Sequence, residues 1–173
     1  MYMRRTREDS HEDGFTFLEL LVVVAIIAIL LTMAVPTFLR ARSSAQDRAA
    51  QTSARVAVMQ ARVIFAESEN FGFASEIELD SAEPSLDFLA LGSESQDATD
   101  ISFVSPSRYV FRSAGYAASD RCWHVQDVED PNSATPHRGV RWAVRVSAGS
   151  TCNAGEVVPA WYRTPGDALS SPF

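Results

Sequence analysis

Few residues in this 173-residue chain are placed to do chemistry, and the most unusual is a single carboxylate in an apolar run. Residues 15–35 read FTFLELLVVVAIIAILLTMAV and carry one charge, Glu19. An acidic side chain costs about 2.5–3.5 kcal/mol near the centre of a membrane-spanning helix, and less towards its end. A carboxylate in this setting needs a partner, so Glu19 is the first candidate functional residue.

The other reactive residue types form no catalytic constellation. The histidines are His11, His124 and His137, and we expect His124, beside Trp123, to be packed or half exposed. The sequence has no Gly-x-Ser-x-Gly motif, no phosphate-binding glycine loop and no pair of Cys-x-x-Cys motifs. We therefore predict no catalytic residue, no cofactor and no enzyme activity.

One cluster of acidic residues could form a metal site. Asp127, Glu129 and Asp130 could together offer oxygen ligands to calcium. A solvated loop that binds no metal is the preferred interpretation, and the sequence leaves both open.

Cys122 and Cys152 are the two cysteines of the chain. They can form a disulfide if this region lies outside the cytoplasm, and two unpaired buried thiols are the alternative. A bridge closing a loop of about 31 residues would stabilise the fold by roughly 3–4 kcal/mol in the chain-entropy model.

Charge divides the chain into a basic and an acidic part. Residues 15–62 carry five arginines against two acids, a formal charge of +3, whereas residues 63–173 carry seven arginines against sixteen acids, a charge of −9. Nucleic acid binding needs a basic surface, so the acidic part argues against a nucleic acid partner.

The elements that position Glu19 begin with one long helix. The 21 residues of the apolar run would span roughly 32 Å as a helix, close to the thickness of a bilayer core. Apolar or small residues then recur every three or four positions, as on one face of an amphipathic helix. These residues are Phe38, Ala41, Ala45, Ala49, Thr52, Val56, Met59, Val63 and Ala66. The arginines fall largely on the other side, which suits solvent or neighbouring chains.

Two features mark the course and the end of this helix. Pro36 removes one backbone hydrogen bond, so we expect a kink or local melting there. Asn70 and Gly72 supply a stop signal, so the helix should run from about 16 to 69.

A small sheet should follow the helix. We expect residues 71–100 to be an extended, exposed loop with a short helical turn near 86–91. Strand patterns then occupy 107–113, 121–128 and 139–147, with 101–104 as a possible fourth, and 129–138 reads as an exposed loop. The predicted fold is α+β, with a long N-terminal helix packed on a small antiparallel sheet.

Residues 1–14, MYMRRTREDSHEDG, read as a removable leader. A secretory signal has its small-residue cleavage site after the apolar run, but here the small residue at the boundary, Gly14, precedes it. A cut after Gly14 would therefore keep the helix. Three arginines in the leader favour a cytoplasmic N-terminus.

The segment Gly14-Phe15-Thr16-Phe17-Leu18-Glu19, continuing as LLVVVAIIAILLTMAVP, resembles the prepilin signature of type IV pilins and type II secretion pseudopilins. The resemblance implies that a prepilin peptidase cuts after Gly14 and N-methylates Phe15. It also implies that Glu19 pairs with the Phe15 amine of a neighbouring subunit. The position of Pro36 and a disulfide near the C-terminus match the same family.

The predicted organisation is a leader (1–14), a transmembrane half of the helix (15–35), an amphipathic half (36–69) and a globular head (70–173). The predicted function is a structural subunit of a type IV pilus-like filament, anchored in the cytoplasmic membrane with its head outside, and on the cell surface after assembly. Its partners would be other pilin subunits, the prepilin peptidase, the inner-membrane assembly platform and the bilayer. A type II secretion pseudopilin is the near alternative, and an unprocessed single-pass binding or sensor domain the distant one.

Overall fold

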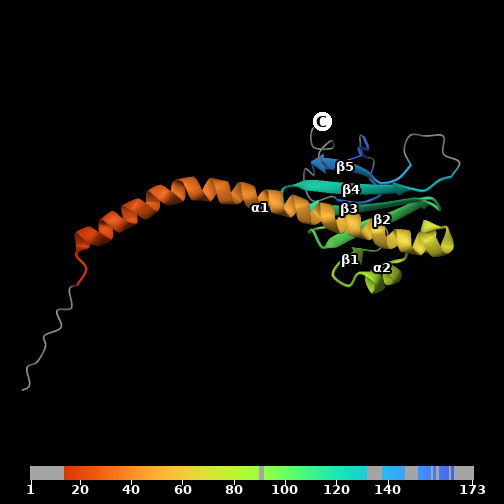
Figure 1. Ribbon diagram of the computed structural model, residues 1–173, viewed down its shortest axis with the longest axis horizontal. Coiled ribbons are helices and arrows are strands. Elements are labelled where there is room, and N and C mark those ends of the chain that lie inside the picture. The colour runs from red at the N-terminus through yellow and green to blue at the C-terminus, as the bar shows by residue number, and fades with distance from the viewer. Residues whose placement is uncertain are drawn as a thin grey trace, which may run out of the picture. The chain divides into compact units, whose positions relative to one another are not determined.

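The computed structural model describes residues 14–89, 92–131, 138–146, 152–156, 158, 160–163 and 165. The chain divides into two compact units, residues 1–40 and residues 41–173 (Figure 1). The first unit holds the apolar part of the helix α1. The second holds the remainder of α1, two short helices and a sheet.

The helix α1 covers Phe17–Ser68, within a residue of the predicted bounds at either end. It ends because Glu69 adopts a left-handed conformation with φ 51°, while its N–H still donates to the carbonyl of Phe65 at 2.7 Å. Such a left-handed residue is a common C-terminal stop of helices. The helix is continuous through Pro36. The kink at Pro36 stays a prediction.

The sheet has five strands in the order β1-β2-β3-β4-β5. Their bounds are β1 Asp87–Leu89, β2 Asp100–Ser107, β3 Val110–Ala117, β4 Arg121–Val128 and β5 Arg141–Val146. Neighbouring strands pair antiparallel, except that β1 pairs in parallel with β2. The α+β prediction is thus confirmed, although the sheet is mixed. Pro106 cannot donate a ladder hydrogen bond, and the β2–β3 register shifts between Val104 and Ser107 around it.

The strand predictions were accurate where the apolar pattern is strong. The predicted bounds of β4 are those observed, and β5 differs by two residues at its start and one at its end. The stretch 101–104 is the interior of β2. The strand predicted at 107–113 was displaced, because residues 108 and 109 form the turn that precedes β3.

The prediction of an extended loop over 71–100 was wrong. This segment contains the 3-10 helix η1 (Phe71–Phe73), the helix α2 (Glu76–Ala82) and β1. Ser75 and Glu78 begin α2 with a capping box, in which each side chain bonds the backbone N–H of the other residue. The helical turn predicted near 86–91 was also wrong, because 87–89 form a strand whose central Phe88 is buried.

The core lies where α1 packs on the sheet. The buried face of α1 consists of Asp47, Ala50, Ala54, Ala57, Val58 and Ala61. Alanines let the helix approach closely: a Cβ added at Gly115 of β3 would lie 3.1 Å from the carbonyl oxygen of Ala50. The larger side chains of this core are those of Phe71, Phe88, Phe111 and Trp123, all of which are buried.

The apolar face predicted for residues 38–66 is therefore not the packed face. Of its nine members Val56 is half-buried, and the others, including Met59 and Val63, are exposed. The pattern misled because the buried stripe is built from alanines, whereas the larger apolar side chains point outward.

Asp47 fixes the start of the packed part of α1. This carboxylate is 93% removed from solvent and accepts hydrogen bonds from Ser119 Oγ at 2.5 Å and Trp123 Nε1 at 3.2 Å. It also pairs with Arg121 at 2.6 Å. The Asp47 side chain thus connects α1 both to the turn between β3 and β4 and to β4 itself.

Asp47→Ala should destabilise the protein by about 2–3 kcal/mol, because it leaves the donors of Ser119 and Trp123 without their acceptor. The Arg121 pair adds little to this figure, since the arginine side chain is 38% exposed. Chemical unfolding of the full chain in detergent, followed by tryptophan fluorescence, would measure the loss. Glu67→Ala, at an exposed position of the same helix, is the control and should cost below about 0.5 kcal/mol.

Candidate assembly and processing site

Gly14 and Phe15 lie ahead of α1 in open space. A Cβ added at Gly14 would meet no atom within 4 Å, and the Phe15 side chain is 86% exposed. Nothing in the described fold requires a glycine at position 14. A glycine that the fold does not need is consistent with recognition by another molecule, as the predicted peptidase would provide.

Glu19 is held by the start of its own helix. Its Oε2 accepts hydrogen bonds from the backbone N–H and the hydroxyl of Thr16, both at 3.2 Å. In return, the Thr16 hydroxyl accepts from the Glu19 N–H at 3.2 Å. These reciprocal bonds form a capping box, the device that also begins α2. The Thr-x-x-Glu spacing was readable in the sequence and was missed.

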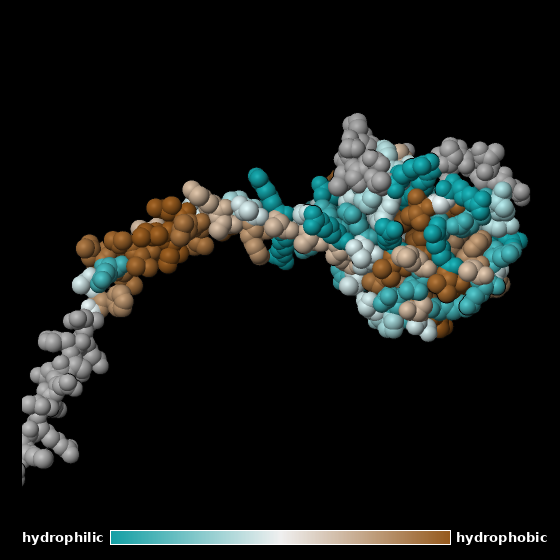
Figure 2. Space-filling view, viewed as in Figure 1, coloured by the Kyte–Doolittle hydropathy of each residue, from teal (hydrophilic) through white to brown (hydrophobic). Residues whose placement is uncertain are grey.

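The helix surface around this carboxylate is apolar and uncovered. Every residue from 14 to 42 is exposed, including large side chains such as Leu20, Ile26 and Leu30. Figure 2 shows most of this stretch as a hydrophobic surface, with a hydrophilic spot near its start and more hydrophilic side chains towards its end. The helix is long and apolar enough to cross a membrane, and none of its most apolar window is buried by the protein.

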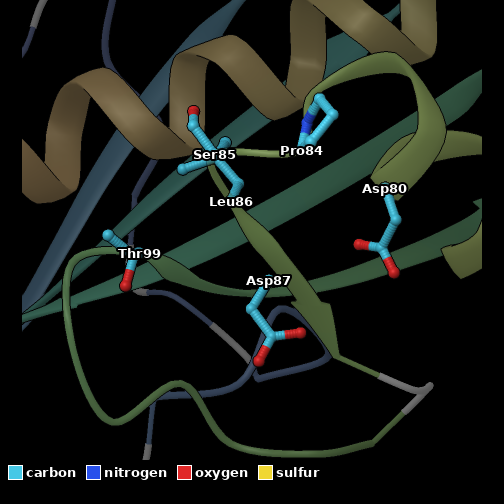
Figure 3. Close-up of a pocket in the computed structure, with 6 residues that line it drawn as sticks. All are labelled: Asp80, Pro84, Ser85, Leu86, Asp87 and Thr99. Carbon is cyan, nitrogen blue, oxygen red and sulfur yellow. The ribbon is translucent and has the colours of Figure 1, made fainter.

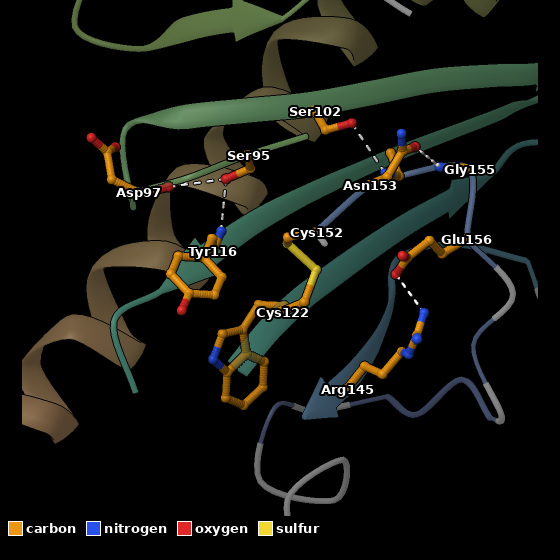
Figure 4. Close-up of a disulfide and its surroundings, with 12 residues drawn as sticks. Ser95, Asp97, Ser102, Tyr116, Cys122, Arg145, Cys152, Asn153, Gly155 and Glu156 are labelled. Carbon is orange, nitrogen blue, oxygen red and sulfur yellow. Dashed lines mark hydrogen bonds and ion pairs between the residues drawn. A yellow bond between two sulfur atoms is a disulfide. The ribbon is translucent and has the colours of Figure 1, made fainter. Parts of the chain in front are cut away.

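The predicted disulfide is present between Cys122 of β4 and Cys152, whose Cα atoms lie 5.3 Å apart (Figure 4). The Cys152 carbonyl accepts from the Ser95 N–H at 2.8 Å, and Ser102 Oγ accepts from the Ala154 N–H at 3.1 Å. The bridge and these bonds tie the C-terminal region to the sheet and to the loop before β2.

The proposed calcium ligands are engaged in the protein itself. Asp127 is fully buried on β4 rather than in a solvated loop, and its Oδ1 accepts from Arg62 of α1 at 2.9 Å. The same guanidinium donates to Glu129 at 3.0 Å. The Asp127 hydrogen bond raises the pKa of Arg62, with smaller contributions from the charges of both acids against the cost of burial. One guanidinium thus bridges two of the three carboxylates that were considered as calcium ligands.

His124 is the most deeply buried ionisable group near the disulfide. Burial lowers its pKa to about 4, and the cations of Arg145 and Arg112 act in the same direction. Its Nε2 has no hydrogen-bond partner in the described part of the chain. It lies near Cys122 and Glu156, but the sulfur of Cys122 belongs to the disulfide and Glu156 pairs with Arg145 at 2.6 Å, so these groups are not a metal site.

An open hollow of about 460 Å³ lies beside β1 (Figure 3). Asp80, Ser85, Asp87 and Thr99 are among the residues that line it. Asp80 is committed to the fold, because its Oδ1 accepts from the Phe88 N–H at 3.1 Å. Among the residues that line the hollow, Asp87 is the exposed acid, and no hydrogen bond joins a lining hydroxyl to a lining carboxylate.

Acid should weaken the head through His124. Its folded pKa lies below the ordinary value of 6.5, so the unfolded chain binds the proton more readily and stability falls as pH drops through 6.5 towards 4. Between pH 7 and pH 5 the loss should be about 2 kcal/mol. His124→Leu should remove most of it in unfolding experiments at the two pH values. An unchanged pH dependence in this variant would show that His124 does not cause it.

Comparison with known proteins agrees with these features. Residues 9–35 match the family described as the prokaryotic N-terminal methylation motif. A 76-residue stretch is 34% identical to the type IV major pilin protein PilA of Myxococcus xanthus. That stretch is 43% of this chain and 34% of the relative, so the match spans about a third of the relative's length. No solved structure matches this chain.

The motif coincides with Gly14, Phe15 and the start of α1, where the structure shows the uncovered apolar helix and its single carboxylate. The α+β arrangement and the disulfide are also those expected of the family. In its N-terminal motif and its apolar helix, the chain resembles the type IV pilin-like proteins.

Proposed function

We propose that this chain is a structural subunit of a type IV pilus-like filament and has no catalytic activity. The observation that carries the proposal is the uncovered apolar part of α1 with one carboxylate, directly after a glycine that the fold does not require. Such a helix is stable in lipid, and in a filament the same surface would be covered by the helices of other subunits.

Cleavage after Gly14 would create the partner that Glu19 lacks. The new amine of Phe15, N-methylated by the prepilin peptidase, would be a cation at the helix start. Both Thr16 bonds end on Oε2 of Glu19, and within the described residues Oε1 has no hydrogen bond, so Glu19 can accept the amine of a neighbouring subunit without losing its cap. A charge pair among packed helices is favourable only when both partners are present, which would enforce register.

Before assembly, residues 15–35 would cross the cytoplasmic membrane, with the leader 1–14 inside and the head 70–173 outside. The disulfide supports an external head, because such bonds persist in oxidising compartments. The amphipathic half, 36–69, would join the two. An assembly platform in the membrane would extract the processed subunit into a surface filament.

A pilin is favoured over a type II secretion pseudopilin by the similarity to a major pilin and by the C-terminal disulfide. Long fibres sheared from cells should contain this chain. A pseudopilin would instead be absent from the sheared fraction.

Gly14→Val should leave full-length precursor in the membrane and abolish filaments, because the peptidase would no longer cut. The head should still fold and form its disulfide, since a side chain at position 14 meets nothing in the protein. Intact mass and N-terminal sequencing of membrane-extracted protein would check both parts. In the unaltered chain, the same measurements should find N-methyl-Phe15 as the first residue. Normal filaments from Gly14→Val would refute the processing scheme.

Glu19→Gln separates the charge of Glu19 from its capping role. Glutamine can still bond Thr16 in a capping box but cannot pair with a cation. We expect filament yield to fall at least tenfold, about 1.4 kcal/mol per added subunit, while helix content in detergent stays unchanged. Glu67→Gln, an exposed acid on the same helix, should assemble normally. Equal yields from the two variants would contradict the role of the charge.

A further inference from the structure

We infer that residues 41–173 carry two complementary surfaces through which successive copies of this chain bind head to tail. One surface is basic and lies on the outer face of α1, and the other is acidic and lies on η1 and α2. This inference rests on the proposed filament function and adds the residues that join the heads. It concerns residues 41–173, outside the apolar segment.

The basic surface lies opposite the packed face of α1. It consists of Arg48, Thr52, Arg55, Met59 and Val63, which are spaced three or four residues apart and so share one helix face. All five are exposed, with Met59 at 55% and Val63 at 57%. Within the described residues, the guanidinium groups of the two arginines have no ion pair or hydrogen bond. The face thus joins free cations to uncovered apolar side chains.

The acidic surface is built around two exposed apolar residues. Ile77 of α2 is 81% exposed and Phe73 of η1 is 58% exposed, four positions apart. Glu76 and Glu78 flank Ile77 and are exposed as well, while α2 is fixed to the protein by buried Leu79. Exposed apolar surface rimmed by polar residues marks interaction sites, and the two acids supply such a rim for Ile77.

A second copy is the occupant that fits both surfaces. Each has an apolar centre, and their charges are opposite, so the basic surface of one copy can cover the acidic surface of the next. Two like copies of either surface would instead bring equal charges together. Contacts between two different surfaces are heterologous, and they produce rings or, where the rotation does not close, open helical filaments, rather than two-fold dimers. The open form is the geometry that a filament requires.

Cysteine cross-linking in filament-forming cells tests the inference on the full chain. The variants are Met59→Cys, Ile77→Cys and the chain with both changes, treated with a thiol oxidant before the fibres are sheared. The native cysteines are paired and buried, so the added thiol is the free one. Val146→Cys, on β5 and 52% exposed, is the matched control.

The double variant should give a ladder of covalent oligomers. Cells that express either Met59→Cys or Ile77→Cys by itself should give only monomers. Cells that co-express these two single variants should give a covalent dimer. Val146→Cys should stay monomeric. Arg48→Glu with Arg55→Glu should lower cross-linking about fivefold, while Arg163→Glu should not.

Three outcomes overturn the inference and leave the filament function standing. The first is a dimer of Met59→Cys alone, which would mean that like faces pair. The second is the absence of cross-links in fibres that contain the chain. The third is a cross-link yield that does not change when the charges of the two arginines are reversed. If the unaltered chain enters no fibre, the proposed function fails and the inference fails with it.

Discussion

The rest of this protein depends on one unmet requirement: residues 17–39 form an apolar helix surface that no described part of the chain covers. At about 25 cal/mol per Å² of apolar area, leaving such a surface in water is strongly unfavourable. Lipid can satisfy it, and so can other helices of the same kind. Under the proposed function, the single carboxylate at its start would gain a cationic partner in a filament from the amine of a neighbouring subunit.

Residues 41–173 differ from this apolar segment, because here the helix and the sheet pack against each other within one chain. The alanine face of α1 lies close to β3, and Asp47 and Arg62 bond to the sheet near the two ends of that face. These contacts fix the rotation of the helix about its axis. Because the alanine face of α1 is held against the sheet, the outward direction of Met59 and Val63 is fixed as well. Packing within one chain therefore decides which side chains face a neighbouring chain.

Sequence reasoning was accurate where a residue type has one dominant physical consequence. The uninterrupted apolar run and the aromatic and β-branched run of β4 are examples, and the cysteine pair, for which two interpretations were open, formed the expected disulfide. The prediction of the buried face of α1 failed, because alanines give a weak hydrophobic signal, whereas the exposed methionine and valine give a stronger one. Asp127 was misplaced for a related reason: an acid near other acids suggests a solvated loop, and its partner Arg62 lies 65 residues away. The missed α2 was within reach, through Ser75 and Glu78.

The disulfide has a consequence for a head exposed outside the cell. Between Cys122 and Cys152 lie most of β4, the connection to β5 and β5 itself. A protease that cuts the connection once leaves the two pieces covalently joined, with β5 still hydrogen-bonded to β4. Under the proposed filament function, a nicked subunit would keep its place in the fibre, and the break would be revealed only after reduction.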